Sequence, residues 1–114
     1  MRDRLFLLTP DFVDPALPGR RFFCPHCALL EGVMVSFPDL ATRVKVVRVG
    51  FPRPRAAVVA LVGAENQSLP LLVLGPDAPS HLATGAWGDV RFASGGMAIL
   101  RALGERHGIP GPHP

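Results

Sequence analysis

The stretch Phe22-Phe23-Cys24-Pro25-His26-Cys27 holds the only two cysteines among the 114 residues of the chain. Two thiols separated by two residues can close into a small disulfide ring. A proline suits the first position of a helix, because its fixed φ is helical and its missing N–H has no partner there. The stretch therefore predicts a dithiol at the start of a helix, where the helix dipole and a protonated His26 favour a thiolate.

Within this motif we expect Cys24 to be the nucleophile and Cys27 to resolve a mixed disulfide, with Pro25 and His26 belonging to the same catalytic group. The spacing alone is also typical of half a zinc site and of an inert pair of thiols. Structural zinc sites usually bring a second Cys-x-x-Cys or a His-x₃-His, and the chain has neither. A redox function without metal ligands is therefore favoured, provided that the flanking fold suits it.

The composition predicts one small globular domain spanning 1–114, with 48% hydrophobic and 18% charged residues. Thirteen prolines and twelve glycines leave room only for short helices and strands. The net charge of +3 comes almost wholly from scattered arginines that are not interleaved with aromatic residues. We therefore expect no nucleic-acid partner.

The apolar runs are short. The run from Leu5 to Leu8 is far too brief for a signal peptide or a membrane span, and later runs are broken by Gly, Pro or charge. We therefore expect a cytoplasmic protein without a membrane partner. In a reducing cytosol a close cysteine pair indicates catalysis, sensing or metal binding rather than a permanent cross-link.

Periodicity predicts alternating strands and helices. Strands are expected at 4–9, 44–49 and 69–74, with a weaker one within 89–92 for which 81–83 is the alternative; helices are expected at 25–36 and 55–62 and from Ser94 to Gly108. In the last helix, Ser94 is the expected cap and Met97 lies on the expected buried side. Gly32 in the first helix is expected to mark a close contact with a strand. The order is strand, helix, strand, helix, strand, strand, helix, which indicates an α/β domain.

The segments outside these elements differ in expected role. The segment 9–23 contains three prolines and leads directly into the cysteines, so we expect a long functional loop that covers a groove or builds a pocket. Arg53 and Arg55 are expected to form an exposed charged turn after the second strand. The segment 109–114 is expected to be a tail.

Three motifs carry a resemblance to the thioredoxin-fold superfamily, covering Leu5 to about His107. Cys24-Pro25-His26-Cys27 is the tetrapeptide found in periplasmic disulfide-oxidising members, and Ser68-Leu69-Pro70 stands where the superfamily has a cis-proline beside its cysteines. Ser94-Gly95-Gly96 resembles the glycine pair of glutaredoxins, which are also the most similar in size and element order. More narrowly, the chain resembles an uncharacterised bacterial thioredoxin-like family. The resemblance implies a β-α-β-α-β-β-α fold with a central mixed four-stranded sheet flanked by helices.

The resemblance also implies a binding surface beside the dithiol. Pro70 would be cis and face Cys24, and the backbone of Leu69 would pair with a bound peptide as an added strand does. Arg21 stands where glutaredoxins keep a basic residue for the glycine carboxylate of glutathione; the alternative is a solvated loop charge. The remaining residues implied in substrate binding are Phe23, Ser94, Gly95 and Gly96, the glycines through N–H groups at a helix N-terminus.

Several departures from glutaredoxins concern glutathione rather than the thiols. The loop before Cys24 is longer, Met97 replaces polar groups, and Phe23 stands where thioredoxin has tryptophan. The implied function is a thiol–disulfide oxidoreductase with no permanently bound cofactor and with glutathione as a candidate co-substrate. Its expected partners are a disulfide-containing protein or a small thiol, with glutathione or a thioredoxin reductase system supplying electrons. The alternatives are a non-catalytic binding or redox-sensing module, and a metal-binding protein.

Overall fold

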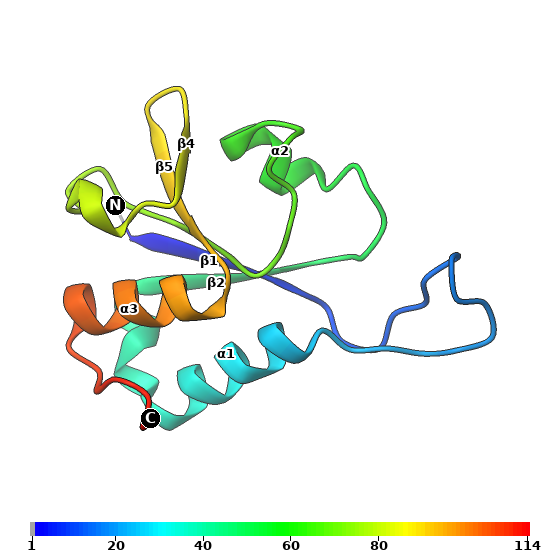
Figure 1. Cartoon of the computed structure of the whole chain (residues 1–114), viewed down its shortest axis with the longest axis horizontal. Coiled ribbons are helices and arrows are strands. Elements are labelled where there is room, and N and C mark those ends of the chain that lie inside the picture. The colour runs from blue at the N-terminus through cyan, green and yellow to red at the C-terminus, as the bar shows by residue number, and fades with distance from the viewer. Residues whose placement is uncertain (1) are drawn as a thin grey trace.

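The computed structural model describes residues 2–114, which form a five-stranded mixed sheet with helices on both faces (Figure 1). The strands are β1 (Asp3–Leu8), β2 (Val44–Val49), β3 (Leu71–Val73), β4 (Gly85–Trp87) and β5 (Val90–Ser94). The α-helices are α1 (Pro25–Ser36), α2 (Ala56–Val62) and α3 (Gly96–His107), and two 3₁₀ turns span η1 (Pro38–Thr42) and η2 (Ser80–Leu82). The predicted α/β class is confirmed.

The sheet has the order β2-β1-β3-β5-β4. Strand β1 runs parallel to β2 and antiparallel to β3, and both β3–β5 and β5–β4 are antiparallel. The prediction of four strands is therefore wrong by one. The additional strand is β4, which forms a hairpin with β5 and is only three residues long. So short a segment, opened by a glycine, gives little alternation from which a strand can be predicted.

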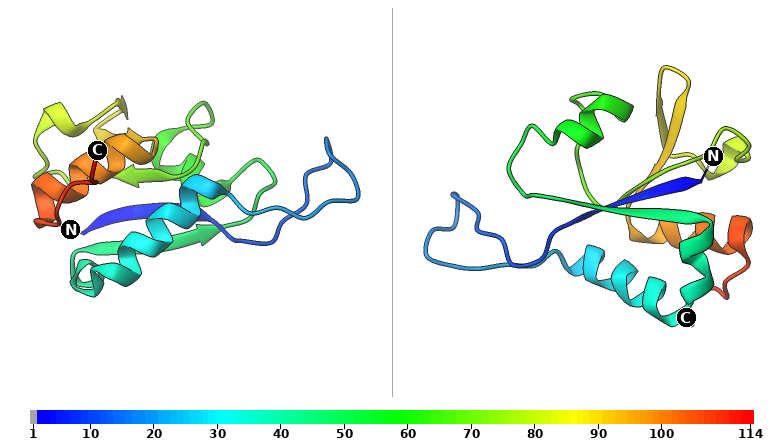
Figure 2. Two further views of the ribbon diagram at one scale, coloured as in Figure 1. Left: turned by 60° about the horizontal axis from the view of Figure 1, so that its bottom comes forward. Right: turned by 180° about the vertical axis from the view of Figure 1, so that it is seen from behind.

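The sheet separates two apolar cores. Helices α1 and α3 lie on one face, and α2 lies on the other (Figure 2). Because side chains alternate along a strand, Leu5 and Leu7 of β1 pack on the α1 and α3 side, while Phe6 packs with Val58 and Val62 of α2. Burial on both faces explains why β1 is a continuous apolar run rather than an alternating one.

The start of α3 differs from the prediction. The N-cap is Gly95, with φ of 91° and ψ of 148°, a conformation that favours glycine. Ser94 instead ends β5, where its backbone N–H donates to Thr84 Oγ1 at 2.9 Å, and the N-cap of the helix makes no side-chain hydrogen bond. Met97 is 70% exposed and lies outside the core, contrary to expectation. By contrast, α1 and β2 have the predicted bounds.

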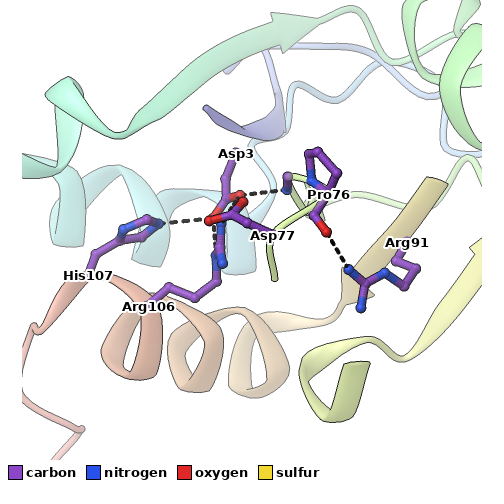
Figure 3. Close-up of polar contacts among 7 residues, drawn as sticks. Asp3, Pro76, Asp77, Arg91, Arg106 and His107 are labelled. Atoms are coloured by element: carbon purple, nitrogen blue, oxygen red, sulfur yellow. Dashed lines mark hydrogen bonds and ion pairs between the residues drawn. The ribbon is translucent and has the colours of Figure 1, made fainter. Parts of the chain in front are cut away.

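A buried carboxylate joins both ends of the described chain (Figure 3). Asp3, 1% exposed, accepts hydrogen bonds from Arg106 at 2.7 and 2.8 Å, from the N–H of Gly75 at 2.7 Å, and pairs with His107 Nε2 at 2.9 Å. Arg106 also reaches the exposed Asp77 at 3.2 Å. This cluster fixes the start of β1 against the turn after β3 and the end of α3.

The helices are short and the chain ends without one. Helices α1 and α3 have twelve residues each. Nowhere between residues 2 and 114 is there a helix with the length and apolar character needed to cross a membrane. The segment 109–114 has no regular secondary structure, as expected of a tail, but Ile109 packs against the larger core.

Candidate functional site

The two cysteines lie at the N-terminus of α1, as the sequence predicts. Cys24 is the N-cap residue, with extended backbone angles, and its sulfur accepts the N–H of Cys27 at 3.2 Å. Pro25 follows at the start of the helix. A cap side chain normally provides an oxygen for one of the unpaired N–H groups of the first turn. Here a sulfur takes that place, so the helix offers Cys24 a hydrogen bond and a partial positive charge.

Cys27 has a different environment, one turn into the helix. It is 3% exposed, and its sulfur accepts the N–H of Leu8, at the end of β1, at 3.5 Å. Burial raises the pKa of the Cys27 thiol to about 12, and the hydrogen bond with Cys24, its charge and the charge of Glu31 act in the same direction. Cys24 is only partly buried, and the two thiols are not bonded to each other. At neutral pH Cys27 is therefore a protonated, shielded thiol next to an accessible one.

A cavity of about 710 Å³ opens over this pair, between the end of β1, the segment 9–23 and the first turns of α1. Its lining is largely apolar and includes both sulfurs. The lining residues are Leu8, Pro10, Asp11, Arg21, Phe22, Phe23, Cys24, Cys27, Ala28 and Glu31. A group bound here is thus brought into reach of the accessible sulfur and is surrounded mainly by apolar side chains.

The segment 9–23, called the arm below, forms one wall of the cavity. It projects from the body between β1 and α1 (Figure 1). Phe12 and Phe22 exchange backbone hydrogen bonds of 2.9 and 2.8 Å, which close the arm at its base. Phe12 also stacks on Phe51, with centroids 4.6 Å apart and planes 9° from parallel. The loop thus lines part of the cavity, as expected, and backbone hydrogen bonds and a ring stack hold its base.

The charged side chains at the rim of the cavity are already paired. Arg21 makes a two-pronged contact with Asp11, with Nε 2.6 Å from Oδ1 and the second nitrogen bonded to Oδ2. Arg48 binds Glu31 in the same manner, at 2.8 and 2.6 Å. The hydrogen bonds from Arg21 lower the pKa of Asp11, and those from Arg48 lower the pKa of Glu31. The positive charges of Arg21 and Arg48 at this rim are therefore each matched by a carboxylate.

Among the described residues, the remaining sequence-predicted site residues do not line the cavity; they are His26, Leu69, Pro70, Ser94, Gly95 and Gly96. The Leu69–Pro70 peptide bond is cis, as the resemblance implied, and Leu69 packs against the core that contains Cys27. His26 is exposed in the first turn of α1. Ser94 borders a different, smaller pocket with Thr84, while Gly95 and Gly96 open α3.

Arg55 is the residue that sequence reasoning misplaced. The predicted exposed charged turn is correct for Arg53 but wrong for Arg55, which is only 7% exposed. Its guanidinium donates to the carbonyl of Phe51 at 3.0 and 2.7 Å and to that of Gln67 at 2.7 Å. The amide oxygen of Gln67 in turn accepts the Arg55 backbone N–H at 2.7 Å. The burial of Arg55 cannot be predicted from its neighbours in the sequence, because its partner Gln67 lies twelve residues away.

Fold and site together define an α/β protein with an accessible and a buried thiol at one helix N-terminus. Among residues 2–114, no three or more His, Cys, Asp or Glu side chains are grouped to hold a metal ion. The chain belongs to the family described as protein of unknown function DUF3088, whose model matches residues 2–111. No curated protein and no solved structure matches it.

Proposed function

We infer that the protein is a thiol–disulfide oxidoreductase that acts through Cys24 and Cys27. The observation that carries this inference is the inequality of the two sulfurs. Cys24 is partly exposed and accepts a helix N–H, whereas Cys27 is buried and has a pKa raised to about 12. A pair divided in this way assigns attack to the first sulfur and resolution to the second.

In the first step the Cys24 thiolate attacks one sulfur of a substrate disulfide. A bond forms between Cys24 Sγ and that sulfur, the substrate S–S bond breaks, and the other substrate sulfur leaves as a thiolate. The Cys27 N–H, 3.2 Å from Cys24 Sγ, stabilises the attacking anion before the reaction. Because the cavity is lined by both cysteines, the substrate disulfide would bind within reach of Cys24.

In the second step Cys27 loses its proton to solvent or to the departing thiolate and attacks Cys24 Sγ. The Cys24–Cys27 disulfide forms, the second substrate sulfur leaves as a thiolate that takes up a proton from solvent, and the dithiol has given two electrons to the substrate. The hydrogen bond with Cys24 and its charge are among the causes that raise the Cys27 pKa. Both are lost once Cys24 is held in the mixed disulfide, so the attack on the substrate itself makes Cys27 easier to deprotonate.

A thioredoxin-like arrangement is part of this proposal. It is supported by the order and directions of β2, β1, β3 and β5, with β4 added at the edge, by the dithiol at the start of α1 and by the cis bond before Pro70. Residues 68–70 precede β3. Because β3 is antiparallel to β1, the amino end of β3 lies at the same end of the sheet as the carboxyl end of β1. This placement favours a peptide bound along Leu69, as the resemblance implied.

The lining of the cavity favours an apolar polypeptide disulfide as the substrate over glutathione. Phe22, Phe23 and Leu8 offer apolar surface, while Arg21, the residue expected to hold a glutathione carboxylate, is bound to Asp11. Glutathione in this proposal is a reductant of the Cys24–Cys27 disulfide, alongside a thioredoxin reductase system.

The test is reduction of a fluorescent peptide disulfide by the wild type and by two serine variants. Cys24→Ser should abolish turnover. Cys27→Ser should form a mixed disulfide through Cys24 that accumulates and is visible by mass spectrometry, because nothing resolves it. Turnover that survives in Cys24→Ser, or no turnover by the wild type with either glutathione or a thioredoxin reductase system, would contradict the proposal.

The second candidate is a module that binds without turnover, favoured by the 710 Å³ cavity and the projecting arm. On the arm and beside the dithiol, Val13 is 65% and Phe23 63% exposed, which is unusual for large apolar side chains unless they contact a partner. In that case the reduced peptide should bind equally well to the wild type and to Cys24→Ser.

A further inference from the structure

Arg55 carries a buried positive charge whose hydrogen-bond partners are all neutral. Its guanidinium donates to two backbone carbonyls, those of Phe51 and Gln67, and lies over the Phe51 ring, 5.5 Å from the centroid. Among residues 2–114, no carboxylate pairs with it. Buried charges are normally paired with an opposite charge, since removing an ion from water is costly. The structure therefore retains a cation at a place where packing alone would not require one.

Arg55 lies at the end of the sheet where the dithiol also lies, beyond the carboxyl ends of β1 and β2. Strands β1 and β2 are parallel, with Leu8 opposite Val49, so the connector after β2 leaves the sheet at the edge where β1 leads to the arm and Cys24. Strand β3 is antiparallel and starts from this same edge, which brings the segment holding Gln67 there as well. Arg55 thus joins the two segments that flank the dithiol edge.

The electrostatics of Arg55 agree with this placement. Burial lowers the pKa of Arg55, and the charge of Arg53 lowers it further, whereas the Cys27 and Cys24 sulfurs, where they are ionised, act to raise it. Of these two sulfurs, that of Cys24 is partly exposed, while Cys27 is a buried thiol that keeps its proton at neutral pH. Phe51, whose ring and carbonyl hold Arg55, packs against the same core as Cys27, with Cys24 on its margin.

We propose that Arg55 is the buried counter-charge of the dithiol, which stabilises the anionic form of the Cys24 sulfur from inside the protein. Three hydrogen bonds from its guanidinium go to carbonyls, and we expect it to act on the sulfur through its charge. The biological use of this charge rests on the proposed oxidoreductase function. Its effect on the Cys24 sulfur can be measured whether or not a substrate turns over.

The consequence for redox equilibrium follows from the balanced reaction. The dithiol and oxidised glutathione give the Cys24–Cys27 disulfide and two molecules of glutathione, with two electrons passing to glutathione. A cation that stabilises the thiolate favours the reduced protein and raises its reduction potential. Neutralising Arg55 should therefore shift the equilibrium towards the protein disulfide by at most about tenfold, the lower end of the range for an opposite charge in close contact. This shift corresponds to a potential lower by about 30 mV.

The test uses alkylation of Cys24 in a Cys27→Ser background, where it is the only thiol. Iodoacetate carries a negative charge and iodoacetamide is neutral, so the ratio of their rate constants reports the local potential at the sulfur. Arg55→Met should lower this ratio, whereas Arg55→Lys, which keeps the charge, should retain most of it. Arg53→Met, an exposed neighbour with the same loss of charge, is the matched control.

A ratio in Arg55→Met equal to that in Arg53→Met overturns the proposal, since a purely structural arginine would not favour an anionic reagent. If Arg55→Met fails to fold, Arg55→Gln, which removes the charge but keeps N–H donors for the carbonyls, takes its place and is compared with Arg53→Gln. Equal ratios in these two variants overturn the proposal as well. Alkylation needs no disulfide substrate. An absence of peptide reduction would therefore refute the proposed function without deciding the effect of Arg55 on Cys24.

Discussion

Alkaline pH should weaken the folded state through the sulfur of Cys27. This thiol has an ordinary pKa of 9.0, which burial first of all raises to about 12. Above pH 9 the unfolded chain loses the Cys27 proton while the folded chain keeps it, so unfolding releases a proton. The stabilising contribution is therefore complete below pH 9 and is lost as the pH rises towards 12.

The size of the effect follows from this shift. A single proton released on unfolding changes the free energy of unfolding by about 1.4 kcal/mol per pH unit. Between pH 9 and pH 11, with the unfolded thiol half ionised at the start, the loss is about 2 to 3 kcal/mol. That is a substantial part of the roughly 5 to 15 kcal/mol that stabilises a small domain.

The assay is urea unfolding under reducing conditions at pH 8 to 11, for the wild type and for Cys27→Ala. The alanine variant loses packing at every pH but has no thiol at position 27 to titrate. The free energy of unfolding of the wild type minus that of Cys27→Ala should therefore fall by about 2 to 3 kcal/mol between pH 9 and pH 11. Leu30→Ala is the matched control, because Leu30 is fully buried on the same helix and does not titrate. A wild-type difference from Cys27→Ala that stays constant from pH 9 to pH 11 would refute the assignment of Cys27 as a shielded thiol.

Two further predictions concern the scaffold. Asp3→Asn should lower stability by about 3 kcal/mol or more in thermal unfolding, because it leaves Arg106 buried without its principal partner; Asp77→Asn, an exposed partner of the same arginine, should leave the melting temperature nearly unchanged. Burial acts to raise the pKa of Asp3, but hydrogen bonds from Arg106, Gly75 and His107 hold it below 3.8. The wild-type advantage over Asp3→Asn should therefore persist above pH 3.8 and shrink as the pH falls through the folded value; a constant difference would contradict it. Gly32→Ala should stabilise by about 0.5 to 1 kcal/mol, since an added Cβ meets nothing within 4 Å, whereas Gly85→Ala should destabilise, since its Cβ would lie 2.6 Å from Phe92 Cζ. Equal melting temperatures for the two glycine variants would show that neither backbone entropy nor the Phe92 contact acts as described.

The features that sequence predicts well are those fixed by neighbouring residues. Pro25 and the dithiol locate the start of α1, and the β-branched run of β2 has its predicted bounds. Gly32 shows the limit of such reasoning: a glycine in a helix suggested a close contact, yet the position is open. What surrounds a glycine depends on the fold and not on its neighbours in the sequence.

The features that sequence misses depend on distant partners. Asp3 meets Arg106 across 103 residues, and Arg55 meets Gln67 across twelve. An arginine in a proline-rich connector has the composition of an exposed turn, and only the return of the chain before β3 supplies the carbonyl that buries it. The pairing of Arg21 with Asp11 is equally invisible, because it requires the arm to close on itself through Phe12 and Phe22.

The distribution of charge around the dithiol connects these observations with substrate choice. At the rim, the positive charges of Arg21 and Arg48 are neutralised by Asp11 and Glu31, so an incoming carboxylate finds no unpaired cation among these four side chains. Arg55, by contrast, is buried and bonded to the carbonyls of Phe51 and Gln67, and under the proposal above its charge acts on the Cys24 sulfur. In the proposed function, the site stabilises a negative charge on sulfur while offering substrates a mainly apolar surface. Under that proposal an apolar peptide disulfide fits both conditions, whereas glutathione, with its two carboxylates, fits only the first.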